Sequence, residues 1–374
     1  KRTLSCPIPT CLQRLLRQKR SDPADTRPAG PRDGTADLVK GIAVILMIQV
    51  HVTEQFATTD VYESILGRVS LFLGGPACAP AFLAVMGYFL SASRKGPLEH
   101  LKRGLLLFAG GIALNTARSA SLLLDFPGTG EPANPWFFIL GADILTLAGL
   151  GIIILVPLKR LFRNQFLPYL ILAIVIVLAT PVLSDSNHAK GASAYLNAFF
   201  RGYAEWSYFP VLPWMAYVLT GYSFGLLKER KTWFNRPEPE KLLIISVPAW
   251  ILLALTLSWA SGITANLSGP GGYYHHGILF FAWSITFLAA WSITVYRIDR
   301  QFESNRLLIL LKWTGRRVTS IYVIQWLIIG NLAAFIYRSQ GLFQLIFWFS
   351  GVVIATLLLG YLYEKARSGL CLLK

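Results

Sequence analysis

The sequence predicts an all-α integral membrane protein, a bundle of about ten transmembrane helices with both termini in the cytoplasm. Of its 374 residues, 54% are apolar and only 14% are charged, and the mean hydropathy is +0.51. Soluble domains carry roughly a quarter charged residues. The apolar residues fall in long blocks, and the basic residues gather on one side of the predicted membrane. Together these observations exclude a water-soluble fold.

The apolar blocks are the predicted membrane crossings. Each has roughly the 18 to 25 residues that a tilted helix needs to cross a hydrocarbon core of about 30 Å. The ten blocks are 38–57, 69–92, 103–123, 136–157, 166–184, 209–227, 241–261, 277–296, 315–337 and 341–363.

The distribution of Lys and Arg predicts the orientation. With the N-terminus in the cytoplasm, 30 of the 35 basic residues fall on the inner side. The outer side keeps Arg68, Arg118, Lys190, Arg201 and Arg338. This asymmetry is the positive-inside pattern, and inserting or deleting one helix would destroy it. It also explains the net charge of +16 without a nucleic-acid partner.

Three segments are expected. Residues 1–37 form a basic, Pro- and Gly-rich cytoplasmic tail, residues 38–368 the transmembrane domain, and residues 369–374 a short C-terminal tail. The first segment has no apolar run and so no secretory signal, and we expect the true N-terminus to precede Lys1. Neither a disulfide framework nor a metal site is expected, because Cys6, Cys11, Cys78 and Cys371 show no paired or metal-binding spacing.

Polar groups inside predicted membrane helices are candidate functional residues, since burying them in lipid is costly. These are His51, Glu54 and Asp143, with Asn115 and Arg118 close by in depth. His51 and Glu54 are three residues apart and share a helix face. Lys40 precedes His51 by eleven residues, about 16 Å along a helix, which places His51 in the outer half of the bilayer.

Other interpretations remain open at this point. His51 could be a structural histidine, Asp143 could fix packing by pairing with Arg118, and Lys40 could simply extend to the lipid interface. The polar residues of the outer loops are expected to be solvated rather than to bind metal: His188, Glu205, His275 and His276.

The stretch DLVKGIAVILMIQVH resembles the first helix of the membrane acyltransferases, the superfamily of acyltransferase-3 proteins and the heparan-α-glucosaminide N-acetyltransferase catalytic domain. Those helices carry a basic residue, ten intervening positions and a histidine, as Lys40 and His51 do here. GADILTLAGLG, YFPVLPWMAYVLTGYSFG and TGRRVTSIYVIQWLI also agree with these families. The chain departs from them at Gln325, where a histidine is frequent, and at His100-Leu-Lys-Arg103, where many acyltransferase-3 proteins have Arg-x-x-Arg.

The resemblance implies transfer of an acyl group, most simply acetyl, from cytoplasmic acyl-CoA to a hydroxyl or amine of an extracytoplasmic carbohydrate. It also implies a location in the bacterial inner membrane. Lys40, Lys102 and Arg103 would bind the CoA phosphates. His51 would act as general base, oriented by Glu54 or Asp143. Asn115 or a tyrosine would stabilise the oxyanion.

Two other functions stay open on the sequence alone. The same polar residues would suit a proton-coupled transporter, although no internal repeat is visible. A non-catalytic subunit of a larger membrane complex would keep the fold without the chemistry. Besides the bilayer and a carbohydrate acceptor, a second copy of the chain or a membrane-complex partner is therefore a possible partner.

Overall fold

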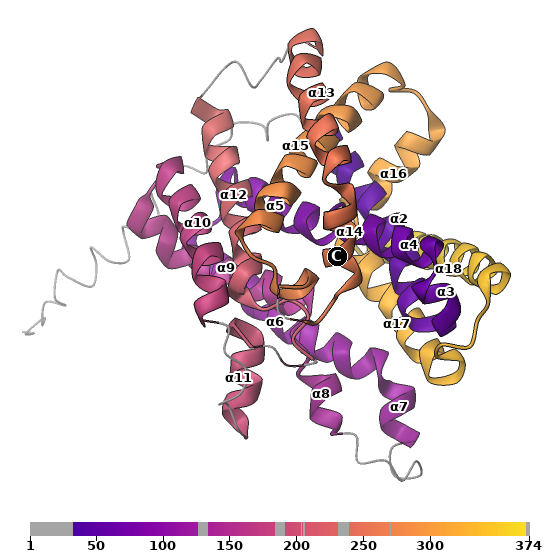
Figure 1. Ribbon diagram of the computed structural model, residues 1–374. Helices are drawn as coiled ribbons and strands as arrows, with labels where there is room; N and C mark the ends of the chain where they lie inside the picture. The colour runs from indigo at the N-terminus through magenta and orange to yellow at the C-terminus, as the bar shows by residue number, and fades with distance from the viewer. Residues whose placement is uncertain are drawn as a thin grey trace, which may run out of the picture. The chain divides into compact units, whose positions relative to one another are not determined.

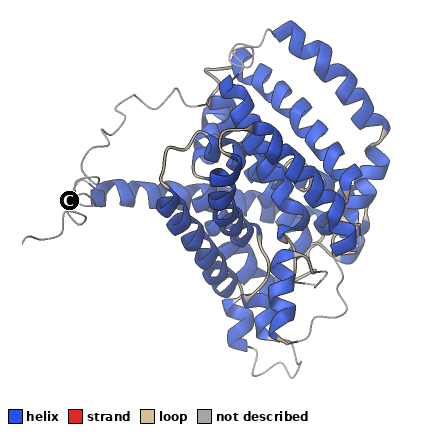
Figure 2. Ribbon diagram, turned by 90° about the vertical axis from the view of Figure 1, so that its left-hand side faces the viewer, coloured by secondary structure: helices blue, strands red, loops and turns tan. Residues whose placement is uncertain are grey.

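The computed structural model describes residues 33–125, 134–183, 191–202, 204, 206–230, 239–269 and 271–371. The chain divides into two units, Lys1–Asp33 and Gly34–Lys374, and the fold is that of the second unit. No strand occurs in these described ranges, where the only bridges are Ala57 to Gln340 and Ala142 to Ser207. Figure 2 shows helices packed on helices throughout the described part. The predicted all-helical membrane fold is confirmed.

The described helices follow one another along the chain as labelled in Figure 1. The first half of the chain forms α2 (Gly34–Phe56), α3 (Thr59–Glu63), α4 (Ile65–Gly74), α5 (Ala79–Ser91), α6 (Pro97–Arg118), α7 (Ala120–Asp125), α8 (Pro135–Ile139), α9 (Ile144–Phe162) and α10 (Phe166–Leu183). The second half forms α11 (Ala192–Phe200), α12 (Val211–Arg230), α13 (Pro239–Leu255), α14 (Leu257–Ala265), the 3₁₀ turn η3 (Tyr273–His275), α15 (Ile278–Gln301), α16 (Arg306–Arg316), α17 (Val318–Ile336) and α18 (Leu342–Cys371).

Seven spans of the described residues are long and apolar enough to cross a membrane. They are α2, α4 with α5, α9, α10, α15, α17 and α18. The count becomes eight if α13 and α14, which meet at a bend of 62°, are taken together as one span. The remaining two predicted blocks coincide with α6 and α12, which are 22 and 20 residues long. The number of ten crossings and the cytoplasmic location of both ends stay predictions.

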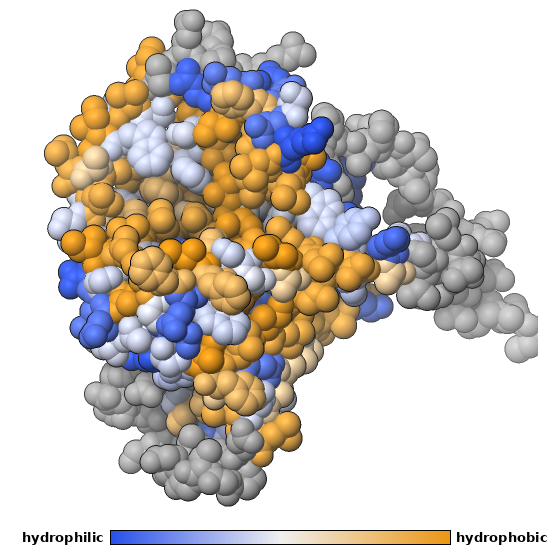
Figure 3. All heavy atoms as spheres, turned by 90° about the vertical axis from the view of Figure 1, so that its right-hand side faces the viewer, coloured by the Kyte–Doolittle hydropathy of each residue, from blue (hydrophilic) through white to orange (hydrophobic). Residues whose placement is uncertain are grey.

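The lipid-facing surface is apolar because the hydrocarbon core of a bilayer offers polar side chains no hydrogen-bonding partner. Figure 3 shows one face on which apolar residues predominate. Exposed aliphatic and aromatic side chains line α18, including Phe343, Phe347 and Ile354, which are 87%, 73% and 66% exposed. α18 therefore carries apolar residues on all of its faces, as expected for a helix at the edge of a membrane bundle.

Two helices lie inside the bundle. α2 contacts α4, α5, α15, α16, α17 and α18, so the residues on every side of it meet other helices. α12 packs against α5, α9 and α10, and Trp214, Ala216, Tyr217, Val218 and Leu219 are completely buried. Among the described helices these two have the most buried residues, and α2 brings His51 to the interior.

Small residues allow the interior helices to approach closely, as is common in membrane bundles. A Cβ atom at Gly221 of α12 would lie 1.9 Å from the carbonyl oxygen of Ala84 in α5, and one at Gly87 of α5 would lie 2.0 Å from that of Val218. Gly41 of α2 and Gly315 of α16 make an equivalent pair, with clashes at 1.9 and 1.8 Å. The backbones at these crossings are in direct contact.

We expect Gly221→Ala to destabilise the protein by roughly 1–3 kcal/mol, because the added methyl group forces α5 and α12 apart. The measurement is the melting temperature of the purified protein in detergent. Gly110→Ala is the matched control, since a Cβ at Gly110 meets nothing within 4 Å. The control should be neutral or slightly stabilising. Equal melting temperatures of the two variants would contradict this account of the α5–α12 crossing.

Candidate active site

A cavity of about 590 Å³ lies beside the second half of α2. Its wall combines many aromatic rings with four ionisable side chains from the predicted crossings, His51, Glu54, Arg118 and Asp143. Mostly apolar walls with a few convergent polar groups are typical of small-molecule sites. The aromatic lining residues are Phe82, Phe137, Phe138, Tyr208, Phe209, Tyr273, Tyr274, Tyr322, Trp326 and Tyr337.

The interruption between α4 and α5 forms part of this wall. Gly74, Gly75, Cys78 and Ala79 line the cavity at the point where the span leaves its helical path. Lipid does not tolerate irregular backbone, but a cavity does. The turn is tied down on both sides, because the Tyr273 hydroxyl donates to the Gly75 carbonyl at 2.9 Å and the Cys78 thiol lies 3.2 Å from the Ala43 carbonyl oxygen.

His51 is held by two consecutive residues of α17. The Nε2 atom of Gln325 lies 3.2 Å from His51 Nδ1, and Gln325 is completely buried. The His51 ring lies against the Trp326 ring, with centroids 4.2 Å apart. The observed partner of Nδ1 is thus a neutral amide and neither Glu54 nor Asp143, the two residues that were expected to orient the imidazole.

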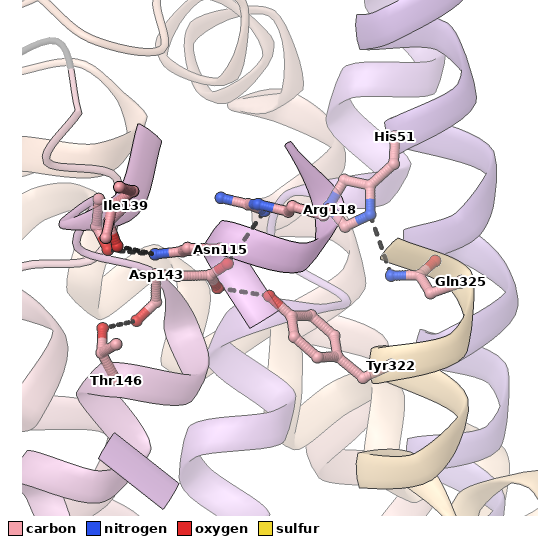
Figure 4. A network of polar contacts seen from close by, with 9 residues as sticks. His51, Asn115, Arg118, Ile139, Asp143, Thr146, Tyr322 and Gln325 are labelled. Carbon is pink, nitrogen blue, oxygen red and sulfur yellow. Dashed lines mark hydrogen bonds and ion pairs between the residues drawn. The ribbon is translucent and has the colours of Figure 1, made fainter. Parts of the chain in front are cut away.

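Asp143, Arg118 and Tyr322 form a separate buried network (Figure 4). Arg118 Nη1 lies 3.1 Å from Asp143 Oδ2, with side chains that are 12% and 5% exposed. The Tyr322 hydroxyl donates to the other carboxylate oxygen, Oδ1. The Arg118 guanidinium also lies over the Trp326 ring, 4.3 Å from its centroid. The alternative in which Arg118 fixes Asp143 is therefore the arrangement observed.

Asn115 lies behind the cavity and not in its wall. Its Nδ2 donates to the Gly141 carbonyl at 2.9 Å and, more weakly, to the Ile139 carbonyl at 3.4 Å (Figure 4). Its side chain is completely buried. These bonds hold the turn that leads into Asp143, so the amide donors point to backbone carbonyls and not to a place where an oxyanion would form.

Glu54 lines the cavity one helical turn beyond His51. Within the described part of the chain, its carboxylate makes no hydrogen bond or ion pair. It differs in this from Asp143, whose two oxygens are both occupied.

The predicted phosphate-binding residues differ in their surroundings. Lys40 Nζ is paired with Asp37 at 2.9 Å, and Asp37 also accepts from Arg316 at 3.1 Å. Lys102 and Arg103 are exposed in the second turn of α6. Lys40 is therefore engaged within the protein, while Lys102 and Arg103 face outward.

The expectation that His275 and His276 are solvated is wrong, because they are only 2% and 0% exposed. His276 Nδ1 lies 2.7 Å from the Tyr273 carbonyl oxygen and its Nε2 lies 2.8 Å from the Tyr217 hydroxyl. In the neutral ring, Nδ1–H donates to the carbonyl and Nε2 accepts from the tyrosine. The loop folds inward because these bonds satisfy a buried imidazole. His188 and Glu205 lie outside the described residues.

Burial lowers the pKa of His276 from 6.5 to about 4. The folded state thus binds fewer protons than the unfolded state between these values. The stability that the neutral ring contributes is complete above pH 6.5 and is lost as the pH falls toward about 4.

We expect the melting temperature in detergent to fall between pH 7 and pH 5, with roughly 2 kcal/mol of destabilisation from this one residue over that range. His276→Gln removes the titrating group and should give a flatter dependence on pH, from a lower starting value because the Tyr217 bond changes. A variant with the same slope as the wild type would show that His276 is not responsible.

One comparison with known proteins shows the family of this chain. A family model described as "Heparan-alpha-glucosaminide N-acetyltransferase, catalytic" matches residues 32–253, more than half of the chain. The chain belongs to this family. It is accordingly a membrane protein of the N-acetyltransferase type. No curated protein matches the chain.

The match spans α2 to the last turns of α13, so it includes His51, Glu54, Arg118 and Asp143 but ends before α17. The α17 residues Tyr322, Gln325 and Trp326 complete both polar networks, and the sequence predicts no role in the site for any of them. Gln325 stands out in the sequence only as a position where a histidine is frequent in the resembling families, because an uncharged amide in an apolar block does not indicate its partner.

Proposed function

We propose that this protein moves an acyl group, most simply acetyl, from cytoplasmic acyl-CoA to a hydroxyl or amine of a carbohydrate on the opposite side of the membrane. One observation carries the proposal: His51 stands in the wall of a 590 Å³ cavity, with Nδ1 held by a buried amide. An imidazole held at one nitrogen can use the other for proton transfer. The resemblance that supports this reaction also implies the bacterial inner membrane.

The Gln325 amide matters because it has both a donor and an acceptor end. As placed, Nε2 faces Nδ1 of His51, while Oε1 has no partner among the described residues. Turning the amide by 180° would bring Oε1 to Nδ1, which would then carry the proton. His51 would present an unprotonated Nε2 to the acceptor, the tautomer that a general base requires.

The reaction then needs few further groups. His51 Nε2 takes the proton of the attacking hydroxyl or amine, the new bond forms at the thioester carbonyl carbon, and the C–S bond breaks. The proton on His51 passes to the leaving sulfur. Among the tyrosines of the cavity, Tyr273 already donates to Gly75. Tyr208 and Tyr274 are the candidates for stabilising the oxyanion, in place of Asn115.

The donor would enter from the end of α2 at which Lys40 lies. Lys102 and Arg103, exposed on α6, are the better candidates for the CoA phosphates, while Lys40 would contribute only if its pairing with Asp37 were shared. The rise of about 16 Å from Lys40 to His51 leaves room for an extended pantetheine arm.

We expect His51→Ala to lower acetyl transfer by roughly 10²- to 10⁴-fold, the usual contribution of a general base. The assay is transfer from radiolabelled acetyl-CoA to glucosamine and to glucose by the protein in nanodiscs. Thr116→Ala, at an exposed position of α6, is the control. A folded His51→Ala protein with unchanged turnover would refute the role of His51. Flux of solute without acetyl-CoA would instead support a transporter.

A second variant separates positioning from proton transfer. Gln325→Leu keeps the volume but removes both hydrogen-bonding ends, so kcat should fall by roughly tenfold while the KM for acetyl-CoA is unchanged. Unaltered kcat would mean that the Gln325 contact has no part in the reaction.

A further inference from the structure

Two completely buried side chains of neighbouring helices each carry an oxygen without a hydrogen-bond partner among the described residues. They are Oε1 of Gln325 in α17 and the hydroxyl oxygen of Thr356 in α18. Figure 4 shows the Gln325 oxygen on the side of the amide that is turned away from His51. An unsatisfied polar group inside a membrane protein is costly, so each of these oxygens should have a partner.

Two pairs of residues indicate the register of α17 and α18. The two helices are in contact and are joined by residues 337–341 alone, so they are antiparallel neighbours. A Cβ atom at Gly360 of α18 would lie 2.6 Å from Cδ1 of Ile321 in α17, so these residues face each other. Two helical turns further on, Ile329 and Val352 are buried in one apolar cluster. Residues that sum to the same position along the two helices therefore lie at the same level.

Gln325 and Thr356 lie midway between these two pairs, one helical turn from each. Residues four apart share a face of a helix, so both side chains belong to the stripe along which α17 and α18 meet. Both are 0% exposed, and neither lines the cavity. The Thr356 hydroxyl and the Gln325 amide thus face each other behind His51.

Other threonines of this protein indicate which part of the Thr356 hydroxyl is free for a bond. Threonines in the described helices commonly donate to the carbonyl oxygen four residues earlier, at 2.8–3.0 Å in Thr116, Thr180, Thr220, Thr286 and Thr294. This is the usual bond of a helical threonine. With the same rotamer, Thr356 would donate to the Val352 carbonyl, and the lone pairs of its oxygen would remain for a donor.

We propose that Thr356 is a positioning residue that sets the tautomer of His51 through Gln325. The Thr356 oxygen accepts from Gln325 Nε2, and this bond turns the amide oxygen to His51 Nδ1. Nδ1 then carries the ring proton, and Nε2 faces the acceptor without one. The inference rests on the acyl transfer proposed above and deepens it, because it names the residue that selects the tautomer a general base requires.

The competing arrangement differs in a single proton. If Thr356 donated to Gln325 Oε1, the amide would keep its Nε2 toward His51 Nδ1, and the ring proton would lie on His51 Nε2. That tautomer has no free electron pair on the nitrogen that must take the proton of the acceptor. The tautomer of His51 therefore distinguishes the two arrangements.

The first measurement reads the tautomer directly. The chain has five histidines, so protein labelled with ¹⁵N only in histidine gives a simple NMR spectrum in nanodiscs, and His51→Ala identifies the His51 signals by their loss. At about pH 8 an imidazole of ordinary pKa is neutral, and its protonated and unprotonated nitrogens have well-separated resonances. The wild type should show a protonated Nδ1. Thr356→Val keeps the shape without the hydroxyl and should move the proton in part to Nε2, whereas Thr356→Ser should keep the wild-type signals.

The second measurement is acetyl transfer by the same variants. Thr356→Val should lower kcat by about 3- to 10-fold, the fold-change that one ordinary hydrogen bond carries, with the KM for acetyl-CoA unchanged. Thr356→Ser should restore kcat. Added to Gln325→Leu, the Thr356→Val change should cause no further loss, because Thr356 acts through that amide. Ser350→Ala is the matched control, since it removes an exposed hydroxyl of α18 that bonds only its own helix, at 2.8 Å from the Ile346 carbonyl oxygen.

The outcomes separate this inference from the proposed function. A protonated Nε2 in the wild type, or an unchanged spectrum of Thr356→Val, overturns the role of Thr356. A loss of kcat that adds to that of Gln325→Leu overturns it as well. If the spectra change as expected in a protein that transfers no acetyl group, Thr356 sets the tautomer and the proposed function fails. Should Thr356→Val not fold, the spectra of the wild type and of Thr356→Ala decide the question.

Discussion

The ion pair between Arg118 and Asp143 is the interaction on which the site depends. It joins the last residue of α6 to the residue that precedes α9, and Tyr322 brings α17 to the same carboxylate. Two charges withdrawn from water are tolerated only when each meets a partner and the remaining hydrogen-bonding capacity is used. Here both oxygens of Asp143 are occupied, and the guanidinium lies on Trp326. Removing one member would leave the others as uncompensated buried polar groups, which is why three helices meet at this depth.

This network also limits which residues can form a hydrogen bond with His51. Because Asp143 is committed to Arg118, it is not available to the imidazole, and a neutral amide takes that place. A carboxylate beside a histidine would favour the charged imidazolium, whereas an amide leaves the ring neutral and able to accept a proton. Trp326 connects the two arrangements, since it carries His51 on its ring and Arg118 as well. On one side of Trp326 lies the Arg118–Asp143 ion pair, and on the other lies the His51 imidazole with its amide partner.

Part of the cavity wall is formed where a helical span is incomplete. The span of α4 and α5 is interrupted at Gly75–Cys78, and Gly75 and Cys78 line the cavity. The inward fold of the loop before α15 supplies Tyr273 and Tyr274 to the wall, and the bonds of His276 to Tyr217 and to the Tyr273 carbonyl hold it there. Backbone and aromatic rings thus form the wall between lipid and the polar groups of the cavity.

Some features of this protein follow from the sequence by itself, because composition and spacing act locally. The apolar blocks predicted membrane-spanning helices, since a helix satisfies the hydrogen-bonding groups of its own backbone inside a bilayer. The cost of charge in lipid singled out His51, Glu54 and Asp143, and all three line one cavity. Partners and orientation depended on segments far apart in the chain, and only the tertiary structure decided them. Gln325 lies 274 positions beyond His51, and no local pattern pairs them. His276 is polar and lies in a Gly-rich loop, so the sequence predicts that it is exposed. The hydrogen bond with the Tyr217 hydroxyl offsets the cost of burying its imidazole. The depth of Asn115 in the membrane follows from its position along one helix, and the sequence predicts it. The direction of its side chain depends on how that helix is rotated against its neighbours, and in the structure the amide points to the Gly141 carbonyl.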